Sequence, residues 1–90
     1  MNETRLEQLQ RHFRHFSLRL VERYNIFITF EEYINFCNLP RIYDEVYIKR
    51  NDGRTCFKGY IKIKGKKISV YRQSSRPRAL LTALPLETKM

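Results

Sequence analysis

Apolar residues in the first quarter of the chain recur with the period of an α-helix. They occupy Leu6, Leu9, Phe13, Phe16 and Leu20. Spacings of three and four residues place such side chains on one helix face. Thr4 and Glu7 have the spacing of a capping box just before this face. The pattern predicts a first helix from about Thr4 to Tyr24.

A second capping box, Thr29 with Glu32, follows after a short apolar connector at residues 26–28. The residues behind it are apolar on most sides, which is typical of a short helix packed on other elements. We expect this helix to end near Asn38, because Pro40 cannot continue it.

From Tyr43 onward the apolar period changes from 3.6 to two, which is typical of β-strands. Turn residues at 51–53 and 64–66 divide this region into Tyr43–Arg50, Thr55–Lys64 and Lys67–Arg72. Three strands joined by tight turns predict an antiparallel meander. Residues 79–86 are apolar again, and their pattern fits a short helix, a fourth strand or a partner-binding tail equally well.

The turns also predict which side chains share a face. A Gly65-Lys66 turn pairs Lys64 with Lys67, and an Asp52-Gly53 turn pairs Asn51 with Arg54. One side then carries Val46, Ile48, Phe57, Ile61, Ile63, Ile68 and Val70. The other side carries Tyr47, Lys49, Lys58, Tyr60, Lys62, Lys64, Lys67, Ser69 and Tyr71. We expect an α+β fold, with two N-terminal helices packed on the apolar face of a three- to four-stranded antiparallel sheet.

Composition bounds what such a chain can be. Ninety residues, 42% of them apolar, suffice for a single domain spanning residues 1–90. No apolar run is long enough for a membrane span, and the polar start does not resemble a signal peptide. Cys37 and Cys56 are too few for a disulfide framework. These features favour a cytoplasmic protein without membrane association.

The net charge of +9 is concentrated in one half of the chain. Residues 1–40 carry five arginines and five glutamates, whereas residues 41–90 carry thirteen Lys or Arg against four acidic residues. The chain thus divides into a neutral helical part and a basic sheet with an apolar tail. A concentrated positive potential attracts polyanions. Lysines also keep exposed sheets from aggregating, which is the alternative explanation.

Lysines alternating with tyrosines on an uncovered sheet face suit single-stranded nucleic acid, because cations follow phosphates and rings stack on unpaired bases. RNA or another single-stranded polynucleotide is therefore the expected partner. The expected contacts are Tyr47, Lys49, Lys58, Tyr60, Lys62, Lys64, Lys67, Tyr71, Arg72, Arg76 and Arg78. Cross-strand packing of the tyrosines, such as Tyr60 against Tyr71, is the alternative explanation for the rings.

Two further functions stay open at this stage. The first is a metal-independent endoribonuclease, with candidate residues Lys58, Lys62, Tyr71, Arg72, Arg76, Arg78, His12 and His15. Its expected architecture resembles that of small bacterial toxins of the RelE kind, an analogy of fold without a shared sequence motif. The second is an interaction protein that binds an acidic protein surface, with Leu80, Leu81, Leu84 and Leu86 available for the partner.

Metal and cofactor chemistry has little support in the sequence. His12, His15, Cys37 and Cys56 lack the close spacing of a zinc site. No glycine-rich phosphate loop, nucleophile elbow or dinucleotide fingerprint occurs. We expect no metal and no cofactor.

Overall fold

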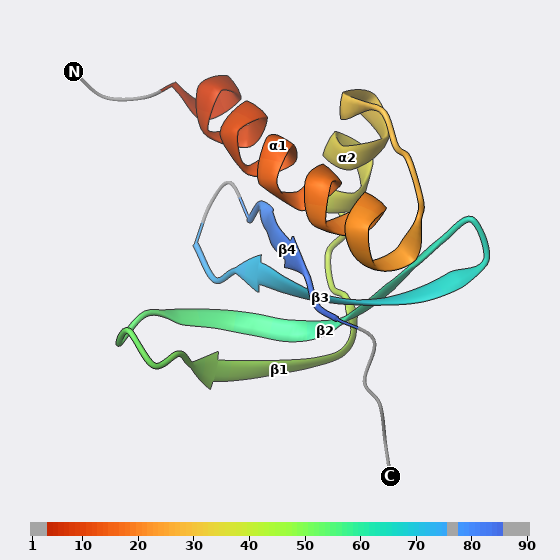
Figure 1. The fold of residues 1–90 in the computed structure, drawn as a ribbon. Helices are drawn as coiled ribbons and strands as arrows, with labels where there is room; N and C mark the ends of the chain where they lie inside the picture. The colour runs from red at the N-terminus through yellow and green to blue at the C-terminus, as the bar shows by residue number, and fades with distance from the viewer. Residues whose placement is uncertain (1–3, 76–77, 86–90) are drawn as a thin grey trace, which may run out of the picture.

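The structure, a computed structural model, describes residues 4–75 and 78–85 (Figure 1). Its elements are α1 (Arg5–Tyr24), α2 (Phe30–Cys37), β1 (Tyr43–Lys49), β2 (Thr55–Ile63), β3 (Lys66–Gln73) and β4 (Leu80–Ala83). The strands form one antiparallel sheet in the order β1-β2-β3-β4. The predicted α+β class and antiparallel meander are confirmed, and the apolar tail supplies a fourth strand. Leu86 and Arg76 lie outside the described residues.

Both helices begin at the predicted capping boxes. The Thr4 hydroxyl accepts a hydrogen bond from the Glu7 N–H (3.1 Å), and the Glu7 carboxylate accepts one from the Thr4 N–H (2.8 Å). Thr29 and Glu32 repeat this exchange at the start of α2. α1 ends at Asn25, which takes the left-handed conformation with a φ of 55°.

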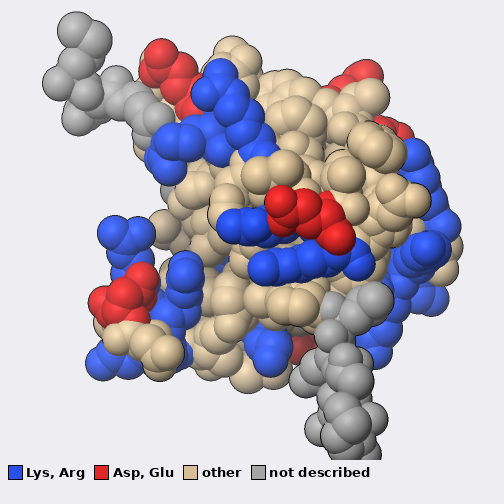
Figure 2. All heavy atoms as spheres, viewed as in Figure 1, with Lys and Arg blue, Asp and Glu red and all other residues tan. Residues whose placement is uncertain are grey.

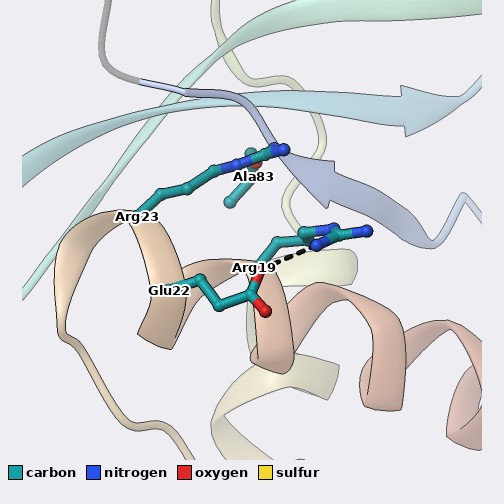
Figure 3. Close-up of polar contacts among 4 residues, drawn as sticks. All are labelled: Arg19, Glu22, Arg23 and Ala83. Atoms are coloured by element: carbon teal, nitrogen blue, oxygen red, sulfur yellow. Dashed lines mark hydrogen bonds and ion pairs between the residues drawn. The ribbon is translucent and has the colours of Figure 1, made fainter.

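The C-terminal half of α1 packs against β4 (Figure 1). The Arg23 guanidinium donates a hydrogen bond to the Ala83 carbonyl (2.6 Å). Figure 3 shows Arg23 reaching toward Ala83, while Arg19 forms an ion pair with Glu22 on the helix itself (2.7 Å). Arg23 therefore links α1 to β4, whereas the Arg19–Glu22 ion pair lies within α1.

The outer edge of β4 is covered by polar groups of both helices. The Tyr33 hydroxyl of α2 donates to the Leu80 carbonyl (2.7 Å), and the Leu80 N–H donates to the Cys37 sulfur (3.4 Å). The Tyr24 hydroxyl of α1 donates to the Leu84 carbonyl (2.8 Å). An uncovered edge would offer these groups to another chain. Side chains of both helices thus form hydrogen bonds with backbone groups of Leu80 and Leu84 at the β4 edge of the sheet.

The core lies between the helices and the inner strands. Its members include Phe16 and Leu20 of α1, Tyr33 and Cys37 of α2, Ile61 and Ile63 of β2, Ile68 and Val70 of β3, and Leu80 and Ala83 of β4. The predicted burial of the four β2 and β3 residues is confirmed. None of the seven described residues of β1 is buried, so the core does not extend under this strand.

The β2–β3 turn lies one residue earlier than predicted, which shifts the strand pairing by two residues without changing the faces. Lys64 and Gly65 occupy its centre, with φ of 51° and 82°, and two positive φ values are what a type I′ turn requires. Ile61 consequently pairs with Ile68 rather than with Val70. Because side chains alternate with a period of two, a shift of two residues leaves every side chain on its predicted face.

The β1–β2 turn differs by one residue, and this inverts β1. A three-residue loop replaces the expected two-residue turn: the Arg50 N–H donates to the Arg54 carbonyl (2.6 Å), and Gly53 takes a φ of 87°. Ile48 therefore pairs with Cys56 instead of Phe57. The prediction that Val46 lies on the core side is wrong, since Val46 is 57% exposed.

The β1 inversion also moves Tyr47, which was predicted on the basic face. Tyr47 pairs with Phe57, and their rings meet edge to face at a centroid distance of 5.5 Å. Lys49 follows two residues later on the same side of β1 and is exposed. Tyr47 and Lys49 therefore face away from the predicted partners Lys58 and Tyr60.

Gly59 explains how the chain enters the sheet. Ile42, which is 4% exposed, packs on the core side of β2 at Gly59. A Cβ at Gly59 would lie 2.9 Å from the Ile42 side chain and would also collide with the Tyr43 carbonyl. Only glycine leaves room for Ile42 at this point of β2.

Candidate nucleic-acid interface

The sheet face opposite the core brings together most of the predicted basic and aromatic residues. We call it the open face and define it by Tyr43, Val46, Ile48, Lys58, Tyr60, Lys62, Lys67, Ser69 and Tyr71. Directly paired residues point to the same side of a sheet, and Lys58 pairs with Tyr71, Tyr60 with Ser69, and Lys62 with Lys67. Of the predicted contact residues, Lys58, Tyr60, Lys62, Lys67 and Tyr71 therefore share one face.

Aromatic rings and cations are interleaved on the open face. The Tyr43 and Tyr60 rings stack at a centroid distance of 5.0 Å and an angle of 22°. The Lys67 ammonium lies 4.3 Å from the Tyr60 ring centroid, within cation–π range. Tyr60 is thus already in contact with a ring and a cation, whereas Tyr43 is 57% exposed. Tyr43 is the ring most available to a ligand.

A depression of about 410 Å³ lies beside this stack. It is bounded by Val46, Ile48, Lys58, Lys67 and Ser69, together with Asp44 at the β1 bulge. Its lining combines two apolar side chains, Val46 and Ile48, with two lysines and one carboxylate. Such a combination suits a ligand with a flat ring and a negative charge.

Basic side chains elsewhere extend the positive surface. Figure 2 shows Lys and Arg atoms gathered at the right of the molecule, toward the β2–β3 hairpin of Figure 1, and at the lower left, toward the β1–β2 turn. At that turn, the Arg50 guanidinium lies 5.5 Å from the centroid of the Tyr71 ring. Arg50 therefore joins the β1–β2 turn to the open face.

Arg72, predicted both as a nucleic-acid contact and as a catalytic candidate, is a structural residue. It is 2% exposed, and its guanidinium donates to the carbonyls of Cys37 (2.7 Å), Arg78 (3.3 Å) and Leu39. Burial lowers the pKa of this guanidinium from its ordinary value, and the charge of Glu45 opposes the shift. Because the Arg72 guanidinium is buried and hydrogen-bonded to carbonyls at the C-terminal end of α2, it does not reach a ligand on the surface.

The remaining predicted residues are dispersed. Lys64 lies in the β2–β3 turn, where its ammonium donates to the Phe27 carbonyl (2.8 Å). Arg78 is exposed beyond the end of β3, with a φ of 58°. Tyr47 and Lys49 lie on the other side of β1, and Arg76 falls outside the described residues.

His12 and His15 meet other elements in a cavity of about 570 Å³, which we call the end cavity. Arg50 and Arg54 from the β1–β2 turn, Gln73 at the end of β3 and Thr82 of β4 also line it. The sequence pattern did not predict Arg50, Arg54 or Tyr43 as site residues. Two arginines flanking a turn were the available signal for the first two, and an aromatic residue at a strand start was the signal for Tyr43.

Within residues 4–75 and 78–85, no three His, Cys, Asp or Glu side chains group in a way that could hold a metal ion. Over the same residues, neither helix has the length and apolarity needed to cross a membrane.

Comparisons with protein-family models, with curated proteins and with solved structures find no match to this chain. Function must therefore be argued from the geometry of the open face and the end cavity.

Proposed function

We propose that the protein binds single-stranded nucleic acid, and RNA in particular, on the open face. The observation that carries this proposal is that Lys58, Lys62 and Lys67 share one sheet face with exposed Tyr43. Lysines can follow the phosphates of a strand while an exposed ring stacks on a base. An open sheet suits splayed bases better than a DNA duplex, whose major groove usually admits a helix or a ribbon.

The pairing of Lys62 with Lys67 gives this proposal further support. Like charges placed directly opposite on neighbouring strands destabilise a sheet. The Lys67 ammonium lies over the Tyr60 ring, which partly offsets its charge. A phosphate bound beside the two paired lysines would neutralise more of this positive charge.

The charge part of the proposal is tested by measuring the anisotropy of a fluorescent single-stranded RNA at several chloride concentrations. The test variant is Lys58→Glu/Lys62→Glu/Lys67→Glu. The matched control, Arg5→Glu/Arg11→Glu/Arg14→Glu, reverses the same number of exposed charges on α1, away from the open face. We expect the test variant to lose affinity on the order of 100-fold and to show a shallower salt dependence. Equal losses in both variants would reject the open face as the binding surface.

The stacking part has a matched pair within one strand. Tyr43 and Tyr47 are 57% and 59% exposed but lie on opposite sides of β1. Tyr43→Ala should weaken RNA binding by about 1 to 3 kcal/mol, the usual contribution of one stacked base. Tyr47→Ala should leave the affinity unchanged. If the wild-type chain bound no RNA and instead captured an acidic protein, the surface would serve protein recognition and the proposal would fail.

A further inference from the structure

The end cavity has the composition of a site for a phosphodiester. Its volume of about 570 Å³ lies within the range of small-ligand pockets. The described lining contains two arginines and two histidines, with hydroxyl and amide groups from residues 55, 73–75 and 82, and it includes no Asp or Glu. Cationic and neutral donors without a carboxylate favour a negatively charged ligand.

The two histidines face the cavity from one side of α1. Residues three apart on a helix have Cβ atoms roughly 5–6 Å apart. At this spacing, His12 and His15 can contact the attacking 2′-oxygen and the leaving 5′-oxygen of one phosphodiester. His12 Nε2 lies 3.4 Å from the Gln73 side-chain nitrogen. The Gln73 oxygen accepts from the Ala79 N–H (3.0 Å), which turns the amide nitrogen toward His12.

This orientation of Gln73 favours different roles for the two imidazoles. The Gln73 amide nitrogen lies where a substrate hydroxyl would lie when it donates to His12 Nε2, and such a hydroxyl can replace this long contact. His12 is therefore placed to accept a proton from a substrate hydroxyl, and His15, the second imidazole of the lining, is left for the donor role. The charged groups facing them from the β1–β2 turn are Arg50 and Arg54, and the β3 and β4 groups of the lining are neutral.

The end cavity is continuous with the open face through one residue. Arg50 lines the cavity and also lies over the ring of Tyr71, which belongs to the open face. In the proposed binding mode, a strand that leaves the open face at Tyr71 meets Arg50 next, and its backbone continues into the cavity.

We propose that the end cavity cleaves RNA by moving a phosphoryl group onto the neighbouring 2′-hydroxyl. His12 takes the proton of the 2′-hydroxyl, whose oxygen forms a bond to phosphorus. The bond from phosphorus to the 5′-oxygen breaks, and the His15 imidazolium gives its proton to that oxygen. Arg50 and Arg54 stabilise the negative charge that builds up on the phosphoryl oxygens. The products are a 2′,3′-cyclic phosphate and a 5′-hydroxyl, and no oxidant, reductant or water is consumed.

This inference rests on the proposed RNA binding, so its test separates the two. The probe is a single-stranded DNA oligonucleotide with one ribonucleotide, compared with the all-DNA oligonucleotide of the same sequence. Both are incubated with the full chain in EDTA, and binding and cleavage are measured on the same samples. We expect cleavage only of the probe with the ribonucleotide, and mass spectrometry should find a cyclic phosphate on the fragment.

Variants assign the cleavage to the cavity. His15→Asn and Arg54→Gln should each lower the single-turnover cleavage rate by about 100-fold or more, with RNA affinity changed less than about threefold. The rate should follow a bell-shaped pH profile in wild type and lose one limb in His15→Asn. Arg14→Gln, an exposed change on α1 outside the cavity lining, is the matched control and should cleave like wild type. Circular dichroism and urea titration verify that each variant is folded.

Each outcome decides something different. Binding without cleavage overturns this inference and leaves the proposed function intact. Cleavage that survives in both His15→Asn and Arg54→Gln also overturns it, because the activity would then come from another site. If the chain binds neither these probes nor the single-stranded RNA and cleaves none of them, the proposed function and this inference fail together.

Discussion

Arg72 is a cationic side chain in the basic half of the chain that the fold uses internally. Its sequence neighbour Tyr71 belongs to the open face, and alternation along β3 turns Arg72 toward the core. There it binds the carbonyls that end α2, where the helix dipole is negative. Composition alone cannot separate such an arginine from a surface one, since the distinction depends on where α2 ends in space.

Replacing Arg72 tests this role. Arg72→Met should lower the free energy of unfolding by about 3 kcal/mol, because buried carbonyls lose charged hydrogen-bond donors. Arg54→Met, at an exposed position of the β1–β2 turn, should change it by less than about 0.5 kcal/mol. Urea titration followed by circular dichroism measures both. Similar small effects of the two substitutions would mean that Arg72 does not support α2.

At the scale of elements, the sequence predicted what depends on local pattern and missed what depends on turn length. Capping boxes gave the helix starts, and alternation gave the faces of β2 and β3. The β2–β3 turn was misplaced by one residue without effect on the faces, because the pairing of β2 with β3 then shifts by two residues. The β1–β2 loop holds one residue more than predicted. Because of this extra residue, Val46 and Tyr47 each lie on the face of the sheet opposite to the predicted one.

The candidate sites follow the same rule. Lys58 and Tyr60 could be predicted because strand alternation is local. The end cavity could not, since it needs α1 to lie near the β1–β2 turn, and no periodicity encodes that approach. His12 and His15 were identifiable as candidates, but their arginine partners were visible only after folding.

The contact of α2 with β4 predicts a pH dependence of stability. Burial raises the pKa of the Tyr33 hydroxyl and of the Cys37 thiol, which lie against Leu80. An acid whose pKa is raised in the folded state keeps its proton to a higher pH in the folded than in the unfolded protein. Their stabilisation is complete below the unfolded-state values of about 8.5 for cysteine and 10 for tyrosine, and it declines as pH rises above them.

We therefore expect the urea midpoint to be constant from about pH 7 to 8 and to fall between about pH 9 and 11. Tyr33→Phe and Cys37→Ala together should flatten this fall, although they lower the midpoint at neutral pH. Burial also raises the pKa of the Cys56 thiol, so Cys56 should account for the decrease of the urea midpoint that remains in the double variant. An equal slope in the double variant and the wild type would contradict the assignment to α2 and β4.

At the scale of the whole molecule, the charge distribution makes two properties respond to salt in opposite directions. The net charge of +9 comes from residues 41–90, so the folded sheet concentrates repulsion among cations. Screening by salt relieves this repulsion and should stabilise the fold. The same ions compete with the protein for phosphates, so RNA binding should weaken.

The two responses can be measured in one chloride series. With about four phosphate contacts, affinity for single-stranded RNA should fall roughly 50-fold between 50 and 200 mM salt. The urea midpoint should rise over the same range. Chloride is preferred to sulfate, because sulfate stabilises folded proteins by exclusion from their surface whatever their charge. If stability and affinity fell together, weaker binding would reflect unfolding instead of screening. If neither changed, the basic half of the chain would not act as a polyanion-binding surface.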